Sequence, residues 1–180
     1  MIDYPIPILG FAAYSGTGKT TLLTKLIPLL KEKGLSVGLI KHAHHAFNID
    51  HEGKDSYRLR EAGAAQVVIA SKKCTATIMD SSDNEIEPLL SDALQAINPM
   101  QALDLLLVEG FKKAAIPKIE LHRQALGKPY LYPDDPMIIA LAEDNENAET
   151  DLPQLDINQT EQIARYIQQW LENVSTQKKS

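Results

Sequence analysis

Residues 13–20, with the sequence AYSGTGKT, decide the fold of this 180-residue chain. The phosphate-binding loop pattern is Gly, four free positions, then Gly-Lys-Ser/Thr, and only its first position differs here, because Ala13 replaces glycine. An apolar run precedes the stretch, and an amphipathic helical pattern follows it. A strand-loop-helix unit of this kind points backbone N–H groups and the positive end of a helix at one spot, which favours an anion there.

We interpret this loop as a site for the phosphates of a nucleotide. The residues expected to bind them are Ser15, Gly16, Thr17, Gly18, Lys19, Thr20 and Thr21. Lys19 is expected to reach the β- and γ-phosphates as a catalytic point charge, and the hydroxyl of Thr20 to hold Mg²⁺. A glycine-rich turn that binds nothing is the alternative, and the flanking strand and helix patterns argue against it.

Composition narrows the class of protein. The chain has 18 basic and 24 acidic residues without a basic stripe, so we expect no nucleic-acid partner. Its one cysteine, Cys74, excludes an internal disulfide and suits a reducing compartment. No apolar run approaches 18 residues, and no basic residue precedes Lys19, so we expect no signal peptide, no membrane partner and a cytoplasmic location.

The apolar patterns predict an α/β protein with the three-layer P-loop NTPase fold, a mostly parallel central sheet and a small β-hairpin extension. Strands are expected near 6–11, 35–41, 67–70, 75–79, 103–109, 118–123 and 137–142. Helices are expected at 18–33, 55–63 and 85–97 and after Asn158, with Asp55 and Asn158 as caps. Residues 1–174 are expected to form one nucleotide-binding domain, and 175–180 a flexible tail.

A carboxylate ends the most apolar of these strands. Residues 103–110 read LDLLLVEG, and Glu109 lies where a P-loop protein places the acid that steers Mg²⁺ or water, because sites lie at the carboxyl ends of parallel strands. Glu109 is therefore a candidate for both the catalytic acid and a metal ligand, and an ordinary surface acid is the alternative. Asp104 precedes the apolar run and should lie at the far end of the strand.

A loop rich in histidine and aspartate follows the second predicted strand. It contains His42, His44, His45, His51 and Asp50. The imidazoles could bind a transition metal, although their spacing follows no fixed pattern. Alternatively, Asp50 could hold Mg²⁺ mostly through water, while the histidines and Lys54 meet phosphate or a partner. A solvated polar loop is the third interpretation.

Four segments together resemble the MobB family of molybdopterin-guanine dinucleotide biosynthesis adapter proteins. They are residues 13–21 (AYSGTGKTT), 39–56 (LIKHAHHAFNIDHEGKDS), 61–65 (EAGAA) and 103–112 (LDLLLVEGFK). The P-loop is shared by many families, whereas the His-rich stretch ending in Gly-Lys-Asp-Ser and the Val-Glu-Gly-Phe-Lys strand end are specific. Ala13 stands where many members have glycine.

The resemblance implies a GTP-binding protein with weak GTPase activity that acts as a homodimer. Its partner would be the molybdenum cofactor guanylyltransferase, the enzyme that attaches GMP to molybdopterin, with molybdopterin as a further candidate. By the family pattern the P-loop binds phosphate, and Asp50 and Glu109 lie near Mg²⁺. Guanine preference does not follow from the residues. Asp144 is placed where its carboxylate could accept hydrogen bonds from the N1 and N2 groups of guanine. The alternative is that Asp144 is an exposed acid in an acidic loop.

Two other functions stay open at this point. A P-loop small-molecule kinase has a similar size and opening, although such kinases commonly close an arginine-bearing lid and no arginine cluster is visible here. A metallochaperone GTPase is suggested only by the His-rich loop. Of the four arginines, Arg58 or Arg60 could approach a bound nucleotide from this subunit or its twin.

Overall fold

The structure, a computed structural model, describes residues 2–43, 49–79, 87–97, 101–145 and 148–177. Contacts divide the chain into two compact units. The first unit consists of residues 1–42 and 88–180, and the second of residues 43–87. The phosphate-binding loop and the strand that ends in Glu109 both belong to the first unit.

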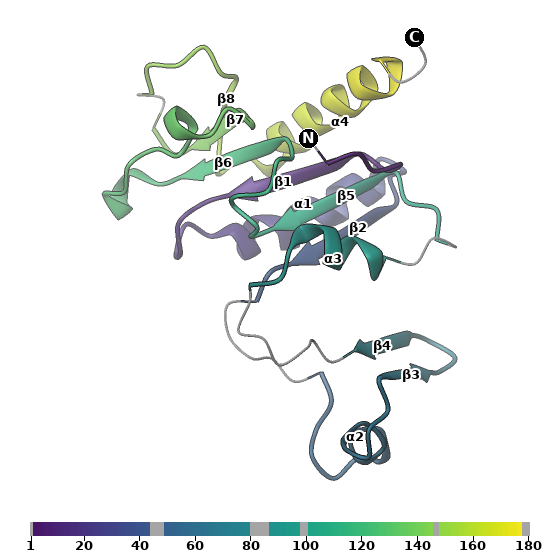
Figure 1. The fold of residues 1–180 in the computed structure, drawn as a ribbon. Coiled ribbons are helices and arrows are strands. Elements are labelled where there is room, and N and C mark those ends of the chain that lie inside the picture. Colours follow the sequence, from purple (N-terminus) through teal and green to yellow (C-terminus); the bar gives the residue numbers. More distant parts are fainter. Residues whose placement is uncertain (1, 44–48, 80–86, 98–100, 146–147, 178–180) are drawn as a thin grey trace. The chain divides into compact units, whose positions relative to one another are not determined.

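The first unit is built on a six-stranded sheet with the order β2-β5-β1-β6-β7-β8 (Figure 1). Its strands are β1 (Ile8–Ala12), β2 (Val37–Lys41), β5 (Leu105–Glu109), β6 (Lys118–His122), β7 (Ile138–Glu143) and β8 (Gln154–Asp156). Each hydrogen-bonded pair in it is parallel. All the carboxyl ends of the strands therefore meet at one edge, which is where ligands bind in sheets of this type.

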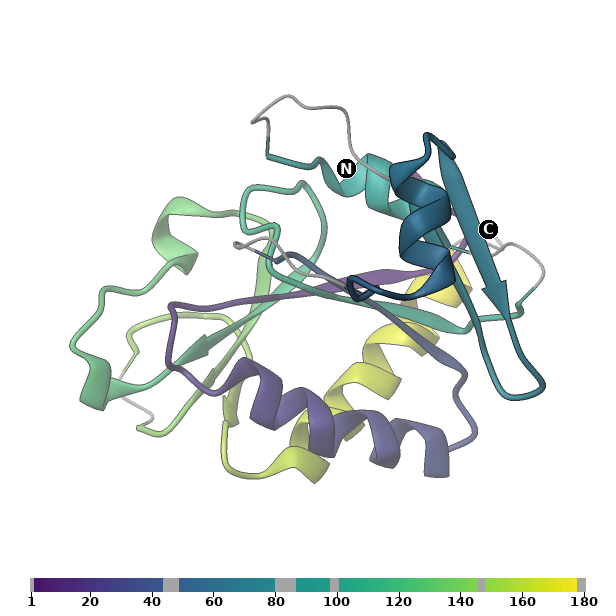
Figure 2. The same cartoon turned by 90° about the horizontal axis from the view of Figure 1, so that it is seen from below.

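Helices cover both faces of this sheet. Helix α1 (Lys19–Glu32) packs against α4 (Thr160–Gln177) on one face, and Figure 2 shows the two side by side. Alternate strand residues such as Leu9, Phe11 and Leu107 point into that core. The intervening residues Ile8, Leu106 and Val108 face α3 (Leu90–Gln95), whose Leu90 and Leu94 cover them. This confirms the predicted three-layer P-loop fold with strands buried on both faces.

The second unit contains a helix and a hairpin. Helix α2 spans Asp55–Glu61, and the antiparallel strands β3 (Gln66–Ala70) and β4 (Thr75–Met79) form the predicted β-hairpin. Among the described residues of this unit only Asp50 and Ile78 are buried. Val68, Ile69 and Met79 are exposed to 59%, 40% and 52%, so the described residues of this unit form little apolar core.

Several predicted boundaries were wrong. The third helix begins at Leu90 rather than near residue 85, since Pro88 and the exposed Leu89 precede it, and residues 85–86 lie outside the described part of the chain. Strand β8 was missed because only three residues form it. Asp55 is the first residue of α2 rather than its cap. Helix α4 begins at Thr160, and the Asn158 side chain accepts a bond from Arg123 instead of capping the helix.

Within the described residues, no helix is both long enough and apolar enough to span a membrane.

Candidate nucleotide-binding site

The loop between β1 and α1 forms a turn that only glycine adopts easily. Gly16 and Gly18 have φ angles of 83° and 95°, in the left-handed region, and Gly18 is the residue that caps α1. Between them Thr17 is buried, and its hydroxyl donates to the Tyr14 carbonyl at 2.8 Å. The turn is thus held from inside, and the first amides of α1 stay at its mouth.

Lys19 folds back over this loop. Its ammonium donates to the carbonyl oxygens of Ala13 at 3.2 Å and Tyr14 at 3.1 Å. Burial lowers the pKa of Lys19, and the nearby positive charge of Lys112 lowers it further. Lys112 itself lies 5.0 Å from the centre of the Tyr14 ring. The Lys19 ammonium is therefore positioned at the loop, where phosphate oxygens could replace the two weak carbonyl acceptors.

Thr20 and Glu109 meet at the start of α1 and the end of β5. The Thr20 hydroxyl donates to Glu109 Oε1 at 2.9 Å. Lys41 Nζ lies 2.9 Å from the same oxygen and 3.5 Å from Thr20 Oγ1. Lys41 and Glu109 are register partners at the carboxyl ends of β2 and β5. The structure thus brings together the hydroxyl and the carboxylate that the sequence singled out, and adds a lysine that it did not.

Asp104 lies at the start of β5, as expected, where its carboxylate accepts a hydrogen bond from the backbone N–H of Ser36 at 2.8 Å.

The turn after β5 is tight. Gly110 has φ 92°, and a Cβ there would lie 2.6 Å from the Cβ of His42. The backbone N–H of His42 donates to the Glu109 carbonyl at 2.8 Å, which ties the end of β2 to the end of β5.

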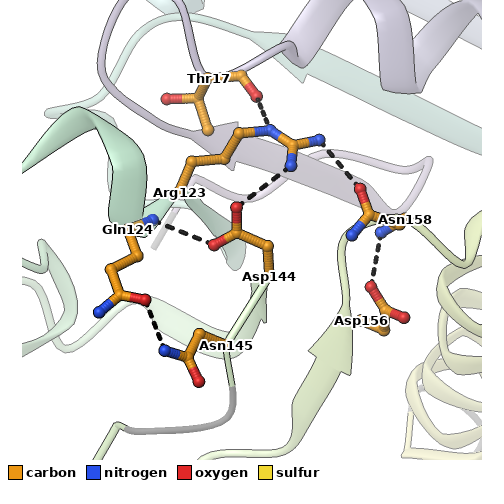
Figure 3. A network of polar contacts seen from close by, with 7 residues as sticks. All are labelled: Thr17, Arg123, Gln124, Asp144, Asn145, Asp156 and Asn158. Carbon is orange, nitrogen blue, oxygen red and sulfur yellow. Dashed lines mark hydrogen bonds and ion pairs between the residues drawn. The ribbon is translucent and has the colours of Figure 1, made fainter.

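A polar network joins the other side of the loop to the ends of β6, β7 and β8 (Figure 3). Arg123 is its centre: Nε donates to the Thr17 carbonyl at 3.2 Å, Nη1 lies 3.3 Å from Asp144 Oδ2, and Nη2 donates to Asn158 at 3.2 Å. A cavity of about 300 Å³ lies beside it, lined in part by Gly16, Gly18, Thr21, Lys25, Arg123 and Asn158. Arg123 was not predicted as a site residue, although it was predicted to end a strand; in the structure it directly follows β6 at this sheet edge.

Asp144 is engaged through both carboxylate oxygens. Oδ1 accepts from the backbone N–H of Gln124 at 3.0 Å, and Oδ2 faces Arg123. The hydrogen bond from Gln124 and the guanidinium of Arg123 hold the pKa of Asp144 below its ordinary value of 3.8. Asp144 is therefore a charged acceptor at neutral pH, linked to the phosphate-binding loop through one arginine.

Asp50 belongs to the second unit. It is 3% exposed, and its Oδ1 accepts from the His51 N–H at 3.0 Å and the Ser56 hydroxyl at 2.9 Å. Its other oxygen is buried without a hydrogen-bond partner among the described residues. His44 and His45 lie outside the described part of the chain. Within that part, no cluster of three or more His, Cys, Asp or Glu side chains could hold a metal ion.

Together, the parallel sheet, the glycine turn before α1 and the acid at the end of β5 define a P-loop nucleotide-binding fold. Residues 8–144 match the sequence family described as Molybdopterin guanine dinucleotide synthesis protein B, or MobB. The chain belongs to this family.

Curated relatives and a solved structure agree with that assignment. The chain is 46% identical over 166 residues to the Molybdopterin-guanine dinucleotide biosynthesis adapter protein of Haemophilus influenzae, covering 92% of this chain and 90% of the relative. It is also 46% identical over 168 residues to the adapter protein of Escherichia coli, covering 93% and 94%. A crystal structure of molybdopterin-guanine biosynthesis protein B superposes with a TM-score of 0.71 at 30% identity, covering 92% of this chain and 99% of that one.

Proposed function

We propose that this chain is a GTP-binding adapter protein in the synthesis of the molybdopterin guanine dinucleotide form of the molybdenum cofactor. It acts beside the guanylyltransferase that attaches GMP to molybdopterin, and molybdopterin is a further candidate ligand. The observation that carries the nucleotide role is the 2.9 Å contact between Thr20 and Glu109 at the mouth of the glycine loop. The adapter role is supported by relatives of that name over nearly the whole chain.

The proposed site also suits Mg²⁺. The ion prefers oxygen ligands and keeps several waters, and the hydroxyl of Thr20 and the carboxylate of Glu109 offer two such oxygens at one point. Thr20 and Glu109 would hold Mg²⁺, which would neutralise charge on the β- and γ-phosphates, and Lys19 would contact these phosphates from the loop. Asp50, which lies in the second unit, is proposed as a further ligand, mostly through water, on the family resemblance alone.

We propose that hydrolysis is weak. Phosphoryl transfer is accelerated mainly by positioning and by added positive charge, often an arginine. Arg123, the arginine nearest the loop in the described contacts, is already held by Asp144 and Asn158. Glu109, the candidate catalytic acid, is held by Thr20 and Lys41. Such a site favours binding over rapid turnover.

Guanine selection is assigned to Asp144. A carboxylate that stays ionised can accept hydrogen bonds from the N1 and N2 groups of guanine, and each of its oxygens has a further lone pair beyond the bonds that it already accepts. Replacement of Asp144 by Asn should reduce the preference for GTP over ATP by about ten-fold, since it turns one acceptor into a donor. An unchanged preference in this variant would remove Asp144 from the proposal.

A homodimer is proposed through the hairpin β3–β4. An isolated two-stranded hairpin is marginal in water, and this one exposes Val68, Ile69 and Met79. A second copy would cover these side chains and the strand edges. In sedimentation experiments, Val68→Asp should shift the protein toward monomer, whereas Lys72→Asp in the hairpin turn should not. A wild-type monomer at micromolar concentration would contradict the dimer.

Titration with GTP and ATP, with and without Mg²⁺, tests the nucleotide role. Wild type should bind GTP more tightly than ATP, and Lys19→Ala should lose at least ten-fold in GTP affinity, because a point charge on the phosphates is gone. Lys31→Ala removes the same charge from the exposed last turn of α1 and should bind like wild type. Equal GTP affinity in all three proteins would contradict the assignment.

The adapter role needs a separate assay with the guanylyltransferase. Added protein should raise the yield of molybdopterin guanine dinucleotide at limiting GTP, and Lys19→Ala should not. Cytoplasmic action is part of this proposal, and the exposed free thiol of Cys74 suits a reducing compartment. An acceptor-dependent phosphorylated product in the same assay would instead indicate a kinase.

A further inference from the structure

Lys41 lies where the proposed magnesium ligands meet. Its ammonium is 2.9 Å from Glu109 Oε1 and 3.5 Å from Thr20 Oγ1. The hydroxyl and the carboxylate are themselves 2.9 Å apart, so the three polar atoms form a compact triangle. A positive charge therefore touches both groups that would coordinate the divalent cation.

The backbone fixes this arrangement. Lys41 is the last residue of β2 and Glu109 the last residue of β5, and the two are paired in register in adjacent parallel strands. Side chains at paired positions project to the same face of the sheet. Lys41 thus approaches Glu109 because of strand register, which does not depend on a chance rotamer of a surface loop.

The two side chains differ in freedom. The Glu109 side chain is 9% exposed and accepts from Thr20, whereas the Lys41 side chain is 52% exposed. A lysine ammonium on a flexible four-carbon stem can leave without disturbing the strand that carries it. The carboxylate and hydroxyl stay in position while the ammonium can be displaced.

We propose that Lys41 is a positioning residue whose ammonium occupies the divalent-metal site in the nucleotide-free protein. A metal–nucleotide complex displaces this ammonium when it binds. This proposal rests on the magnesium site proposed above. Lys41 neutralises Glu109 and keeps it aimed at Thr20 in the nucleotide-free protein. A bare divalent cation must compete with the ammonium, whereas a metal that arrives with a triphosphate gains phosphate ligands as well. Metal binding is thereby made conditional on nucleotide.

An ordinary surface ion pair is the competing explanation. Exposed pairs contribute little to stability. If Glu109 is not a metal ligand, breaking its pair with Lys41 changes no affinity for a specifically bound ion. The two explanations therefore differ in a single measurable quantity, the affinity of the nucleotide-free protein for a divalent ion. Stability alone does not separate them.

The test uses Mn²⁺ as the probe and the nucleotide-free full chain, with free Mn²⁺ measured by electron paramagnetic resonance. Lys41→Gln should bind Mn²⁺ about ten-fold more tightly than wild type, because a positive charge within a few ångströms of the ion is gone. Lys31→Gln carries the same change of net charge in the last turn of α1 and should match wild type. Lys41→Arg keeps the charge and should also match wild type.

A double variant, Lys41→Gln with Glu109→Gln, locates the bound ion. It should lose the gained affinity, because the carboxylate freed by the first change is removed by the second. Equal Mn²⁺ binding by Lys41→Gln and Lys31→Gln, whether both bind or neither does, would overturn the proposal. So would a gain that survives in the double variant. Nucleotide titration of Lys19→Ala stays a separate test, so failure of one does not imply failure of the other.

Discussion

The hydroxyl of Tyr130 donates a 2.9 Å hydrogen bond to the buried carboxylate of Glu143. Glu143 ends β7 and is 2% exposed, and its other oxygen has no hydrogen-bond partner among the described residues. Beside it, Tyr130 packs on His122, with ring centroids 4.1 Å apart. The segment after β6, which begins with Arg123, is thus held to the sheet through the contacts of Tyr130 with Glu143 and His122.

Removing this hydrogen bond should destabilise the fold. Tyr130→Phe leaves the buried Glu143 carboxylate short of a donor, and we expect a loss of roughly 1–3 kcal/mol in the free energy of unfolding. Urea denaturation followed by circular dichroism measures it. Tyr132→Phe is the matched control, because among the described residues its hydroxyl makes only an exposed 3.4 Å bond, to the Glu149 carbonyl. Equal losses in both variants would contradict the assignment.

The same pair predicts a pH dependence. Burial, followed by the hydrogen bond to Glu143, raises the pKa of Tyr130 from 10.0 to about 12. A raised folded-state pKa means that the contribution of this group to stability is complete below pH 10 and is lost as the pH rises from about 10 to about 12. The difference between the ultraviolet titration curves of wild type and Tyr130→Phe should show a phenol that ionises at this high pH. Glu143→Gln should lower the pKa of Tyr130. A difference titration centred near 10 would disprove the coupling.

Thr20 should matter to metal-dependent binding and little to folding. Thr20→Val removes the hydroxyl that contacts Glu109, so Mg²⁺ should no longer increase GTP affinity, and we expect a loss of about ten-fold or more. Thr24→Val is the control, since Thr24 lies one turn further along α1, is exposed, and bonds only the Thr21 carbonyl in the described contacts. Isothermal titration with and without Mg²⁺ gives both numbers, and matched behaviour of the two variants would exclude Thr20 as a ligand.

Alanine substitutions at Gly110 and Gly127 distinguish the cost of backbone strain from that of a steric clash. Both have positive φ, 92° and 57°, but an added Cβ would meet His42 at Gly110 and nothing within 4 Å at Gly127. Gly127→Ala should cost about 1–2 kcal/mol from the left-handed backbone alone. Gly110→Ala should cost roughly 2–4 kcal/mol, since crowding adds to it. Thermal unfolding measures both, and a smaller loss at Gly110 would contradict the tight turn after β5.

Most of the fold could be predicted from the sequence because its strands are buried on both faces. Continuous apolar runs such as residues 105–108 have no other stable environment in a domain of this size. Strand β8 escaped prediction because its three residues carry no periodic pattern. The start of α4 was placed one residue early, since Asn158 has the chemistry of a cap but is used by Arg123.

The candidate site divides in the same way. Lys19, Thr20 and Glu109 were predictable, because a local motif and a strand end specify them. Lys41 and Arg123 were not, because their roles depend on which strand ends become neighbours: β2 beside β5, and β6 beside β7. Sequence patterns predict strands, but only the order of strands in the sheet determines these pairs.

That order has a consequence for folding during synthesis. Strands β1 and β2 do not pair with each other, because β5 lies between them. A nascent chain that ends before Leu105 therefore contains two apolar strands without their common neighbour. Contacts of such long sequence separation slow folding. The phosphate-binding loop is made before β5, so the contact between Thr20 at its end and Glu109 cannot form until the whole of β5 has left the ribosome.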